Sequence, residues 1–276
     1  MPTNNYDKSN PRQQEHFIIH LNRTIPVTYD GPITIEQAKL ATSAPSFQKW
    51  LQNLSSPAPN SQTHDEPSPS PSQPILLHAV HLQSIDMFGK RVGFIKLRAN
   101  CTTPDGRHTL PGICLLRGSA VAVLVSLRAE ETNEEYCVLT EQARVPAGKV
   151  ILEIPAGMID GPSGTFCGTA AKELKEECDI VVKEDELIDL TSMYEEGIPM
   201  SPGGCDEYIK LFYCVKTMTK NELESLQGKL TGLRDEGELI TLRLVKMDTV
   251  WKTCCDAKLL CALFLVEKWK SRNGES

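Results

Sequence analysis

The sequence predicts an α+β fold in which a mixed sheet packs against helices, preceded by a smaller β-rich N-terminal region. Two observations carry this prediction. Apolar stretches with the length and residue types of strands fill most of the chain after residue 75, and two helical patterns, at 169–178 and 256–270, interrupt them. Strands that are interleaved with a few helices indicate a sandwich of a sheet and helices.

The size and charge of the chain limit what it does. Its 276 residues, 40% of them hydrophobic and 24% charged, suffice for one or two globular domains. The formal net charge of −7 argues against nucleic acid and anionic membranes as partners. The longest apolar run, 259–266, is far shorter than the roughly 18 residues that a membrane span needs. An anionic substrate therefore requires local arginines or a metal ion.

Composition divides the chain into four parts. Residues 1–54 are an N-terminal extension that we expect to be partly ordered. Residues 55–74 are rich in proline and serine with hardly a hydrophobic side chain, so they cannot offset the entropy of ordering and are expected to be a flexible linker. A β-rich subdomain at 75–118 and the main domain at 119–270 follow.

Each expected element follows from a local pattern. In the N-terminal extension, 17–21 has the pattern of a strand, and 35–54 that of a helix. A dense apolar run at 120–127 indicates a fully buried strand. The other strands are expected at 75–84, 91–101, 109–117, 136–141, 149–154, 208–215 and 238–245.

The cysteines indicate a reducing compartment. There are ten, scattered through apolar stretches without a C-x-x-C pair, and the pair Cys254–Cys255 is vicinal. This spacing fits neither a zinc site nor a disulfide framework, so we expect free structural thiols. The polar first residues lack the features of a signal or transit peptide. The expected location is therefore the cytoplasm, and a plastid only if a transit signal is missed or absent from this chain.

An acidic helix is the most informative segment. On a helix Glu173 and Glu177 stack at i, i+4, and Glu176 flanks them, while Leu174 belongs to a separate apolar face. Like charges at this spacing destabilise a helix by roughly 0.2–0.5 kcal/mol. A divalent cation bound by the carboxylates would offset this repulsion. The alternative interpretation is a solvated charged face.

The segment that contains this helix resembles the Nudix box, G-x5-E-x7-R-E-U-x-E-E-x-G-U, in which U is aliphatic. Gly157 and the three glutamates match the pattern. The loop is one residue longer than the pattern, with Gly164 nearest the place of its first glutamate. Lys172 replaces the arginine and Asp179 the glycine. Lysine keeps the charge but not the bidentate fork, and aspartate tolerates the left-handed conformation at some cost.

Further motifs resemble the ADP-ribose/ADP-sugar branch of that family, most of all the plant-type ADP-sugar diphosphatases. They occur in the right order over about 75–270. They are Arg117-Gly118, 140–146, 153–157, Ser201-Pro-Gly-Gly-x-x-Glu207, 226–229, 231–238 and Asp256-Ala-Lys258. The resemblance implies a Nudix α/β/α sandwich with a mixed sheet. It also implies a homodimer, in which the β-rich subdomain at 75–118 is expected to take part in dimerisation and to contribute strands to the partner's site.

The resemblance also implies the reaction. We expect hydrolysis of the diphosphate bond of ADP-sugars, such as ADP-glucose and ADP-ribose, to AMP and a sugar phosphate. The expected cofactor is Mg²⁺ or Mn²⁺, held by the Ala156 carbonyl, Glu173, Glu176 and Glu177, which would activate a water molecule.

A glutamate on a loop is expected to act as the general base. The related enzymes have theirs before the penultimate strand, and we favour Glu236 because Glu238 is expected to begin that strand. Glu207 is a weaker candidate, and the predicted catalytic residues are Glu236, Glu176 and Glu207. The alternative for Glu236 is a simple acidic turn.

Substrate-binding residues are expected on two other segments. Arg144, just after a strand, would clamp a phosphate or the terminal sugar, and its alternative is a surface ion pair. The glycine pair would let backbone N–H groups approach a phosphate, unless the loop is an ordinary surface turn. The predicted substrate-binding residues are Arg144, Arg117, Ser201, Gly203 and Gly204.

Two alternatives to this function stay open. One is a hydrolase of another nucleotide sugar, such as UDP-glucose or GDP-mannose. The other is a catalytically silent domain that senses a nucleotide sugar, which the replacements at Lys172 and Asp179 keep in consideration. Metal-dependent turnover separates an enzyme from a sensor.

Overall fold

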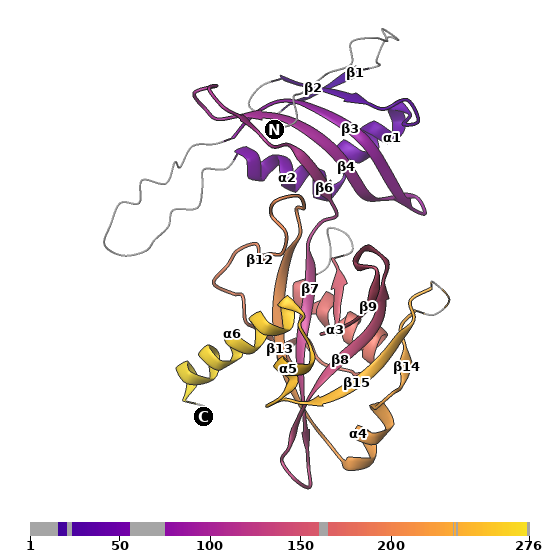
Figure 1. Ribbon diagram of the computed structural model, residues 1–276, viewed down its shortest axis with the longest axis vertical. Helices are drawn as coiled ribbons and strands as arrows, with labels where there is room; N and C mark the ends of the chain where they lie inside the picture. Colours follow the sequence, from indigo (N-terminus) through magenta and orange to yellow (C-terminus); the bar gives the residue numbers. More distant parts are fainter. Residues whose placement is uncertain are drawn as a thin grey trace, which may run out of the picture. The chain divides into compact units, whose positions relative to one another are not determined.

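A computed structural model describes residues 16–20, 24–55, 75–159, 165–233, 235 and 237–274 (Figure 1). They fall into two units. The first comprises the described residues of Met1–Gly118 and the segment Ser201–Glu207, and the second those of Ser119–Met200 and Tyr208–Ser276.

The first unit is built on a six-stranded sheet in the order β1-β2-β3-β4-β5, with β6 also paired to β4. Residues 24–55 and 75–118, which composition assigns to separate parts, share this sheet and one core because β2 pairs in parallel with β3. Its elements are β1 (His16–His20), β2 (Thr24–Tyr29), α1 (Ile35–Ser43), α2 (Pro45–Ser55), β3 (Leu76–Phe88), β4 (Arg91–Thr102), β5 (Thr109–Leu110) and β6 (Ile113–Leu116).

The single helix expected at 35–54 is wrong, because two helices meet at Ala44. This residue has extended backbone angles, φ −64° and ψ 144°. Pro45 follows, and a proline disfavours helical angles in the residue before it while fitting the first position of the next helix. Phe47 and Leu51 of α2 then pack into the core of the first unit.

The second unit is a nine-stranded sheet in the order β11-β13-β7-β8-β15-β14, with β10 on β7, β12 on β13 and β9 on β8. The sheet is mixed, since β13 and β7 run parallel and the other pairs are antiparallel. The strands are β7 (Ala120–Ala129), β8 (Glu135–Arg144), β9 (Lys149–Glu153), β10 (Ala156–Met158), β11 (Ile188–Asp189), β12 (Ile198–Pro199), β13 (Tyr208–Met218), β14 (Leu230–Thr231) and β15 (Ile240–Lys246).

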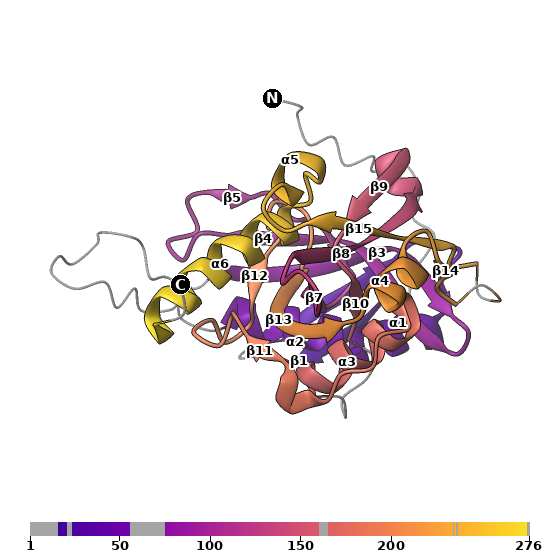
Figure 2. The same cartoon turned by 90° about the horizontal axis from the view of Figure 1, so that it is seen from below.

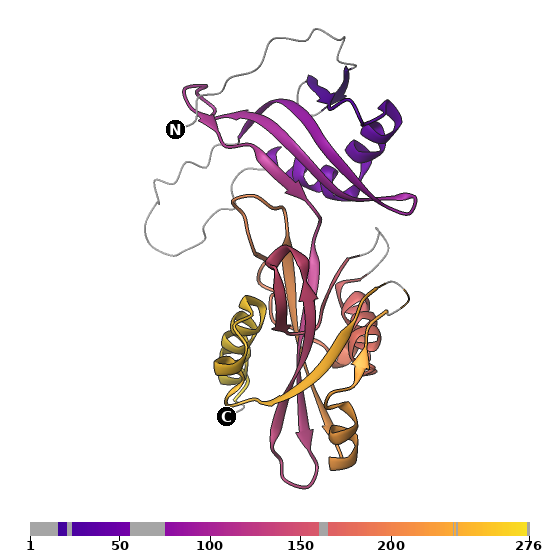
Figure 3. The same ribbon diagram turned by 45° about the vertical axis from the view of Figure 1, so that its right-hand side comes forward.

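Helices cover both faces of this sheet (Figures 2 and 3). Along β7, Val121 and Val123 pack in the core that contains Leu174 of α3, while Ala122 and Leu124 pack in the core that contains Leu259 of α6. Side chains of a strand alternate between its faces, so a strand between two helical layers is apolar throughout. The predicted α/β/α sandwich is confirmed. The helices are α3 (Phe166–Cys178), α4 (Lys220–Leu226), α5 (Val250–Thr253) and α6 (Ala257–Asn273), and single 3₁₀ turns span Val145–Ala147 and Glu184–Glu186.

The two ends of α3 are capped by polar side chains. Thr165 Oγ1 accepts a hydrogen bond from the Gly168 N–H at 2.9 Å. Asp179 ends the helix in the left-handed region, with φ 56°. Hydrogen bonds from Lys175 and Lys229 to its carboxylate lower the pKa of Asp179 to about 2. Aspartate therefore takes the place of the expected glycine, and two lysines compensate its negative charge.

Two further boundaries differ from expectation. Strand β15 begins at Ile240, two residues after Glu238, which was expected to open it. Helix α3 begins at Phe166 rather than at residue 169, because Thr165 supplies the N-cap. Within the described ranges, no helix has both the length and the apolar content that crossing a membrane requires.

Candidate active site

Glu177, near the end of α3, is a buried acid among like charges. Glu177 is only 2% exposed. Its Oε2 accepts a hydrogen bond from the Ala156 N–H at 3.0 Å. Burial, then the charges of Glu173 and Glu238, raise the pKa of Glu177 well above its ordinary value, and the Ala156 N–H and the charge of Arg144 oppose this only in part. An ionised Glu177 therefore has a strong need for a positive charge.

Gly157 is what lets Glu173 approach β10. A Cβ atom on Gly157 would lie 1.9 Å from Cδ of Glu173, within the carboxylate itself. No other residue fits at this position unless the glutamate moves. The absence of a side chain at Gly157, in β10, is thus the steric condition for Glu173 to approach the strand that carries Ala156, another predicted metal ligand.

Glu176 is held differently from the other two glutamates. It is half-buried, and Lys172 Nζ lies 3.6 Å from its Oε2, an i, i+4 pair on α3. Lysine gives a point charge where arginine would give a fork. Among the described side chains, no three of histidine, cysteine, aspartate and glutamate form a closed metal cluster.

The chemistry of the donor set nevertheless fits a divalent cation. Hard carboxylate oxygens suit Mg²⁺ and Mn²⁺, and these ions use one or two carboxylates with retained waters rather than a complete protein cage. The raised pKa of Glu177, which burial and two neighbouring carboxylates cause, marks an uncompensated negative charge at this place. A cation is the group that would compensate it.

Arg144 brings a positive charge to the same carboxylates. It ends β8, and its Nε donates to Glu153 Oε1 at 2.6 Å. Burial lowers the pKa of Arg144, but Glu153, Glu177 and Glu238 outweigh this and raise it. The ion pair with Glu153 is not a surface pair, because Glu153 is only 7% exposed. The sequence predicted that Arg144 belongs to the site, but it did not reveal Glu153 as the partner of Arg144.

The partner belongs to a chain of four alternating charges that sequence reasoning also missed. Lys258 Nζ lies 3.0 Å from Glu153 Oε2 and 2.9 Å from Asp256 Oδ1. Asp256 is the N-cap of α6, where its carboxylate also accepts the N–H groups of Lys258 and Ile154, each at 3.1 Å. The only sequence signal was the motif Asp256-Ala-Lys258, to which no chemistry was assigned.

The candidates for the general base differ in their surroundings. Glu236, the favoured one, lies outside the described residues. The reason for preferring it is wrong, since Glu238 stands before β15 and not in it. Glu238 Oε2 accepts the Leu233 N–H at 3.2 Å, and its charge acts on both Glu177 and Arg144. Glu238 is therefore close to the acidic site.

Gln142 is a further polar group on the face of β8 that carries Arg144. The two residues are two positions apart on one strand and so point to the same side. Gln142 Oε1 is buried and has no hydrogen-bond partner among the residues that the structure describes. A buried carbonyl oxygen without a donor is costly, so it is a position where a ligand or water would be accepted.

The remaining predicted residues belong to the first unit. Arg117 Nη1 lies 3.0 Å from Glu207 Oε1, and the Arg117 guanidinium lies over the ring of Phe94 at 5.9 Å. Glu207 is thus held in an ion pair with Arg117. To act as a general base, Glu207 would have to break this ion pair. Gly203, Gly204 and Ser201 are exposed on the same segment.

The segment 201–207 is tied to β6 by its backbone. The Leu115 N–H donates to the Gly204 carbonyl at 2.8 Å, and the Gly204 N–H donates to the Ser201 carbonyl at 3.1 Å. Asp206 Oδ1 accepts the Arg117 N–H at 2.7 Å. These bonds explain why a segment within the range expected for the main domain belongs to the first unit.

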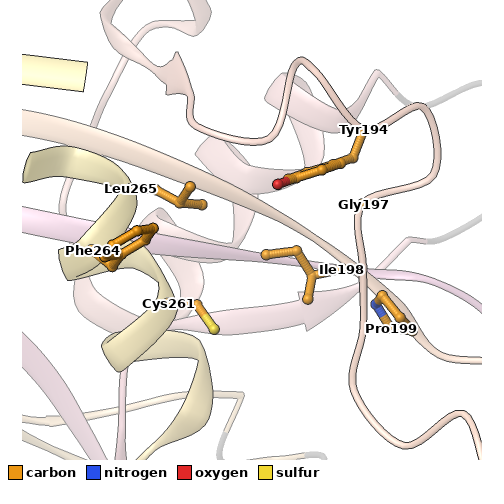
Figure 4. A pocket seen from close by; sticks show the side chains of 7 residues that line it. All are labelled: Tyr194, Gly197, Ile198, Pro199, Cys261, Phe264 and Leu265. Atoms are coloured by element: carbon orange, nitrogen blue, oxygen red, sulfur yellow. The ribbon is translucent and has the colours of Figure 1, made fainter. Parts of the chain in front are cut away.

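An apolar pocket of about 280 Å³ lies between the loop before β12 and helix α6 (Figure 4). None of its lining residues is charged, and none belongs to the acidic site. They are Tyr194, Gly197, Ile198, Pro199, Cys261, Phe264 and Leu265.

Comparison with known proteins identifies the family. The profile of the NUDIX domain matches residues 117–259. The protein named Nudix hydrolase 14, chloroplastic, of Arabidopsis thaliana is 39% identical over 250 residues, which are 89% of this chain and 77% of that protein. The chain therefore belongs to the Nudix family, and the prediction of a Nudix hydrolase is confirmed.

More distant relatives match shorter segments. A protein named ADP-ribose pyrophosphatase from Haemophilus influenzae is 30% identical over 154 residues, 52% of this chain and 62% of that protein. A solved structure titled "Crystal structure of ADP compounds hydrolase" covers 73% of this chain and 99% of its own, with 16% identity and a TM-score of 0.46. At that level of likeness, the family assignment rests on the profile and the plant relative.

Proposed function

We propose that this protein hydrolyses the diphosphate bond of nucleoside diphosphate sugars, with ADP-ribose and ADP-glucose as substrates and AMP and a sugar phosphate as products. The observation that carries the proposal is the buried Glu177 carboxylate, surrounded by Glu173, Glu238 and Arg144. Such a site offers oxygens to a cation and a guanidinium to an anion, the two requirements of a diphosphate with its metal ion. Two relatives bear the name ADP-ribose pyrophosphatase, which supports the choice of substrate.

Ala156, through its carbonyl, and Glu173, Glu176 and Glu177 are the groups that we propose for holding Mg²⁺ or Mn²⁺. The burial of Glu177 and the contact of Glu173 with Gly157 support this assignment. When bound, the cation would neutralise the carboxylates, polarise phosphorus and lower the pKa of a water molecule.

Arg144 would bind a phosphate oxygen of the substrate. Among the described residues, only its Nε has a hydrogen-bond partner, and its side chain is 37% exposed. The terminal nitrogens of the guanidinium therefore remain for a ligand, and guanidinium groups bind phosphate oxygens strongly.

A glutamate of the segment before β15 would accept the proton of the attacking water. Glu238 is supported by its nearness to Glu177, and Glu236 by the resemblance of the sequence. Glu207 is the third candidate. Substitution of each by glutamine separates them, because loss of a general base lowers kcat by about a hundredfold or more, whereas a neighbouring acid has a smaller effect.

AMP release tests the proposal. The full chain is incubated with Mg²⁺ and equal concentrations of ADP-ribose, ADP-glucose, UDP-glucose or GDP-mannose, and nucleoside monophosphate is measured. Faster turnover of the two adenine compounds is the expected result. If only UDP-glucose or GDP-mannose is hydrolysed, the proposed substrate is wrong but the proposed hydrolysis of a diphosphate bond stands. Binding of these compounds without turnover, with metal present, would contradict hydrolysis and favour a sensor.

Two further properties belong to the proposal. We expect a homodimer, which the resemblance to ADP-sugar hydrolases supports and light scattering of the full chain would test. The cytoplasm is the proposed location, supported by ten free cysteines. The chloroplast in the name of the plant relative is the alternative, and a fluorescent fusion separates the two.

A further inference from the structure

Lys258, in the first turn of α6, pairs with the carboxylate of Glu153, which also pairs with Arg144. Its ammonium lies 3.0 Å from Glu153 Oε2 and 2.9 Å from Asp256 Oδ1. Its side chain is only 12% exposed. A lysine so far withdrawn from water is retained only where carboxylates compensate its charge.

The two oxygens of Glu153 are thereby divided between two cations. Oε1 accepts the Nε–H of Arg144 at 2.6 Å, and Oε2 accepts Lys258 Nζ. An unhindered arginine and carboxylate commonly pair through two parallel hydrogen bonds, which use two nitrogens of the guanidinium. Here the second oxygen is taken, so Arg144 uses Nε alone toward Glu153.

We propose that Lys258 is a positioning residue for substrate binding. By occupying one oxygen of Glu153 it limits the Glu153–Arg144 pair to a single contact and leaves both terminal nitrogens of Arg144 for the diphosphate. This inference rests on the proposed function only in naming the ligand of Arg144. The arrangement of the guanidinium itself is independent of any substrate.

The charges of the chain make the arrangement sensitive to Lys258. Arg144, Glu153, Lys258 and Asp256 alternate in sign. Burial lowers the pKa of Lys258, but Asp256 and Glu153 outweigh it and raise that pKa. Burial raises the pKa of Glu153, and the two cations outweigh it and lower that pKa. The directions of these shifts, with the raised pKa of Arg144, favour the charged forms of Arg144, Glu153 and Lys258.

Removal of Lys258 has a defined geometric consequence. Asp256 stays in place, because its carboxylate is also bonded to the N–H of Ile154. Glu153 then has a free buried oxygen, and among the described residues Arg144 is the one cation that still pairs with it. The guanidinium is expected to turn into a two-bond pair with Glu153, which removes one terminal nitrogen from the ligand.

The first experiment observes Arg144 directly, without substrate. In nitrogen-15 NMR of the full chain, the Arg144 side-chain signals are assigned by their loss in Arg144→Ala. Hydrogen bonding of a terminal nitrogen slows its rotation and separates its signals. We expect averaged terminal signals in the wild type and separated ones in Lys258→Met. Lys258→Arg, which keeps the charge, is expected to resemble the wild type.

The matched control is Lys216→Met. Lys216 is another lysine of the second unit in an ion pair, with Glu186 at 2.6 Å. Within the described part of the chain, its hydrogen bond and ion pair go to Glu186 and not to the chain of four. Its substitution is expected to leave the Arg144 signals unchanged. If Lys258→Met does not fold, Lys258→Leu serves in its place, since leucine also removes both the charge and the hydrogen bonds to Glu153 and Asp256.

The second experiment measures affinity for α,β-methylene ADP-ribose with Mg²⁺, a compound that cannot be hydrolysed at the diphosphate. Lys258→Met is expected to weaken binding about tenfold, the usual effect of losing a residue that orients a binding group. The effect should appear in KM more than in kcat during turnover. In an Arg144→Ala background, Lys258→Met should change affinity no further.

The outcomes are distinct. Unchanged Arg144 signals in Lys258→Met, or an equal loss of affinity with and without Arg144, would overturn the positioning role, and a fall in melting temperature alone would then make Lys258 a structural tie. Altered Arg144 signals in a protein that binds no nucleotide sugar would overturn the proposed function and retain the positioning of Arg144.

Discussion

The two buried glutamates of the second unit, Glu177 and Glu153, lie in opposite electrostatic surroundings. Glu153 stands between Arg144 and Lys258, which outweigh its burial and lower its pKa. Glu177 stands beside Glu173 and Glu238, which add to its burial and raise its pKa, while the Ala156 N–H and the charge of Arg144 oppose this only in part. One carboxylate is fully compensated by the protein, and the other is not.

The difference teaches what each carboxylate is for. A buried charge without a partner is strongly unfavourable, so the chain retains Glu177 at a cost in its own stability. A compensated charge such as Glu153 holds its neighbours in place instead. The first arrangement is typical of a site that a ligand completes, and the second of a scaffold around it.

The largest expected effect is that of Glu177→Gln on turnover. Removing this charge should lower kcat by on the order of a thousandfold, because a cation contributes several kcal/mol to the transition state. The metal-free variant should be no less stable than the wild type, since a neutral amide removes the repulsion. AMP release and melting temperature in EDTA check both. A metal-free variant that melts far below the wild type would contradict the comparison.

Glu153→Gln should show the reverse pattern. Its amide removes the buried charge that Lys258 and Arg144 share, so unfolding should become easier by about 3 kcal/mol. We expect Mg²⁺ to raise the melting temperature of this variant and of the wild type alike. Denaturant unfolding with and without Mg²⁺ is the measurement. Equal stability of variant and wild type would show that Glu153 is not a scaffold residue.

Gly157→Ala tests the steric condition at the acidic site. The added Cβ would lie within the Glu173 carboxylate, so the glutamate must turn away, at about 1–3 kcal/mol of folding free energy. Turnover should fall, and more Mg²⁺ should be needed for half-maximal activity. Gly148→Ala is the control outside the acidic site, where no atom lies within 4 Å but φ is 67°. A Gly157→Ala enzyme with normal metal dependence would refute the steric role.

The pH dependence of stability follows from the raised pKa of Glu177. In metal-free protein the folded state keeps a proton that the unfolded state loses above about pH 4.5. This contribution is therefore complete below that pH, and it is lost, by at most about 1.4 kcal/mol per pH unit, as pH rises through the folded pKa. The measured slope in EDTA should be larger for the wild type than for Glu177→Gln; identical slopes would refute it.

The smallest effect is expected at Asp179. Replacing it with glycine relieves the left-handed backbone but removes the pairing with Lys175 and Lys229. These exposed contributions are of opposite sign, so stability should change by less than about 1 kcal/mol. Chemical unfolding and AMP release check this. A large gain in turnover would show that Asp179 impairs the site.

Much of the fold could be predicted because it depends on local patterns. The apolar run of β7 predicts a strand between two layers, and the spacing on α3 separates Leu174 from the glutamates. The break at Ala44 was also predictable, since Pro45 follows it. The position of 201–207 in the first unit was not, because it depends on backbone bonds to β6, and the sequence neighbours of that segment belong to the second unit.

Site residues that are close together in the sequence could be predicted, and those that are far apart in the sequence could not. Glu173, Glu176 and Glu177 come from one helix and show their spacing directly. The Glu153–Lys258 pair joins segments far apart in the chain. No periodic pattern in the sequence around either residue indicates its partner. The start of β15 was missed by two residues, and this was enough to misjudge Glu238.

Titration of Mn²⁺ into metal-free protein tests the central claim, that the uncompensated charge of Glu177 is reserved for a cation. Calorimetry in two buffers of different ionisation enthalpy measures both binding and proton release. We predict that the wild type binds Mn²⁺ with a release of protons that grows as the pH is lowered. Glu177→Gln should do neither, and Lys216→Met should behave as the wild type. Equal binding by wild type and Glu177→Gln would contradict the account.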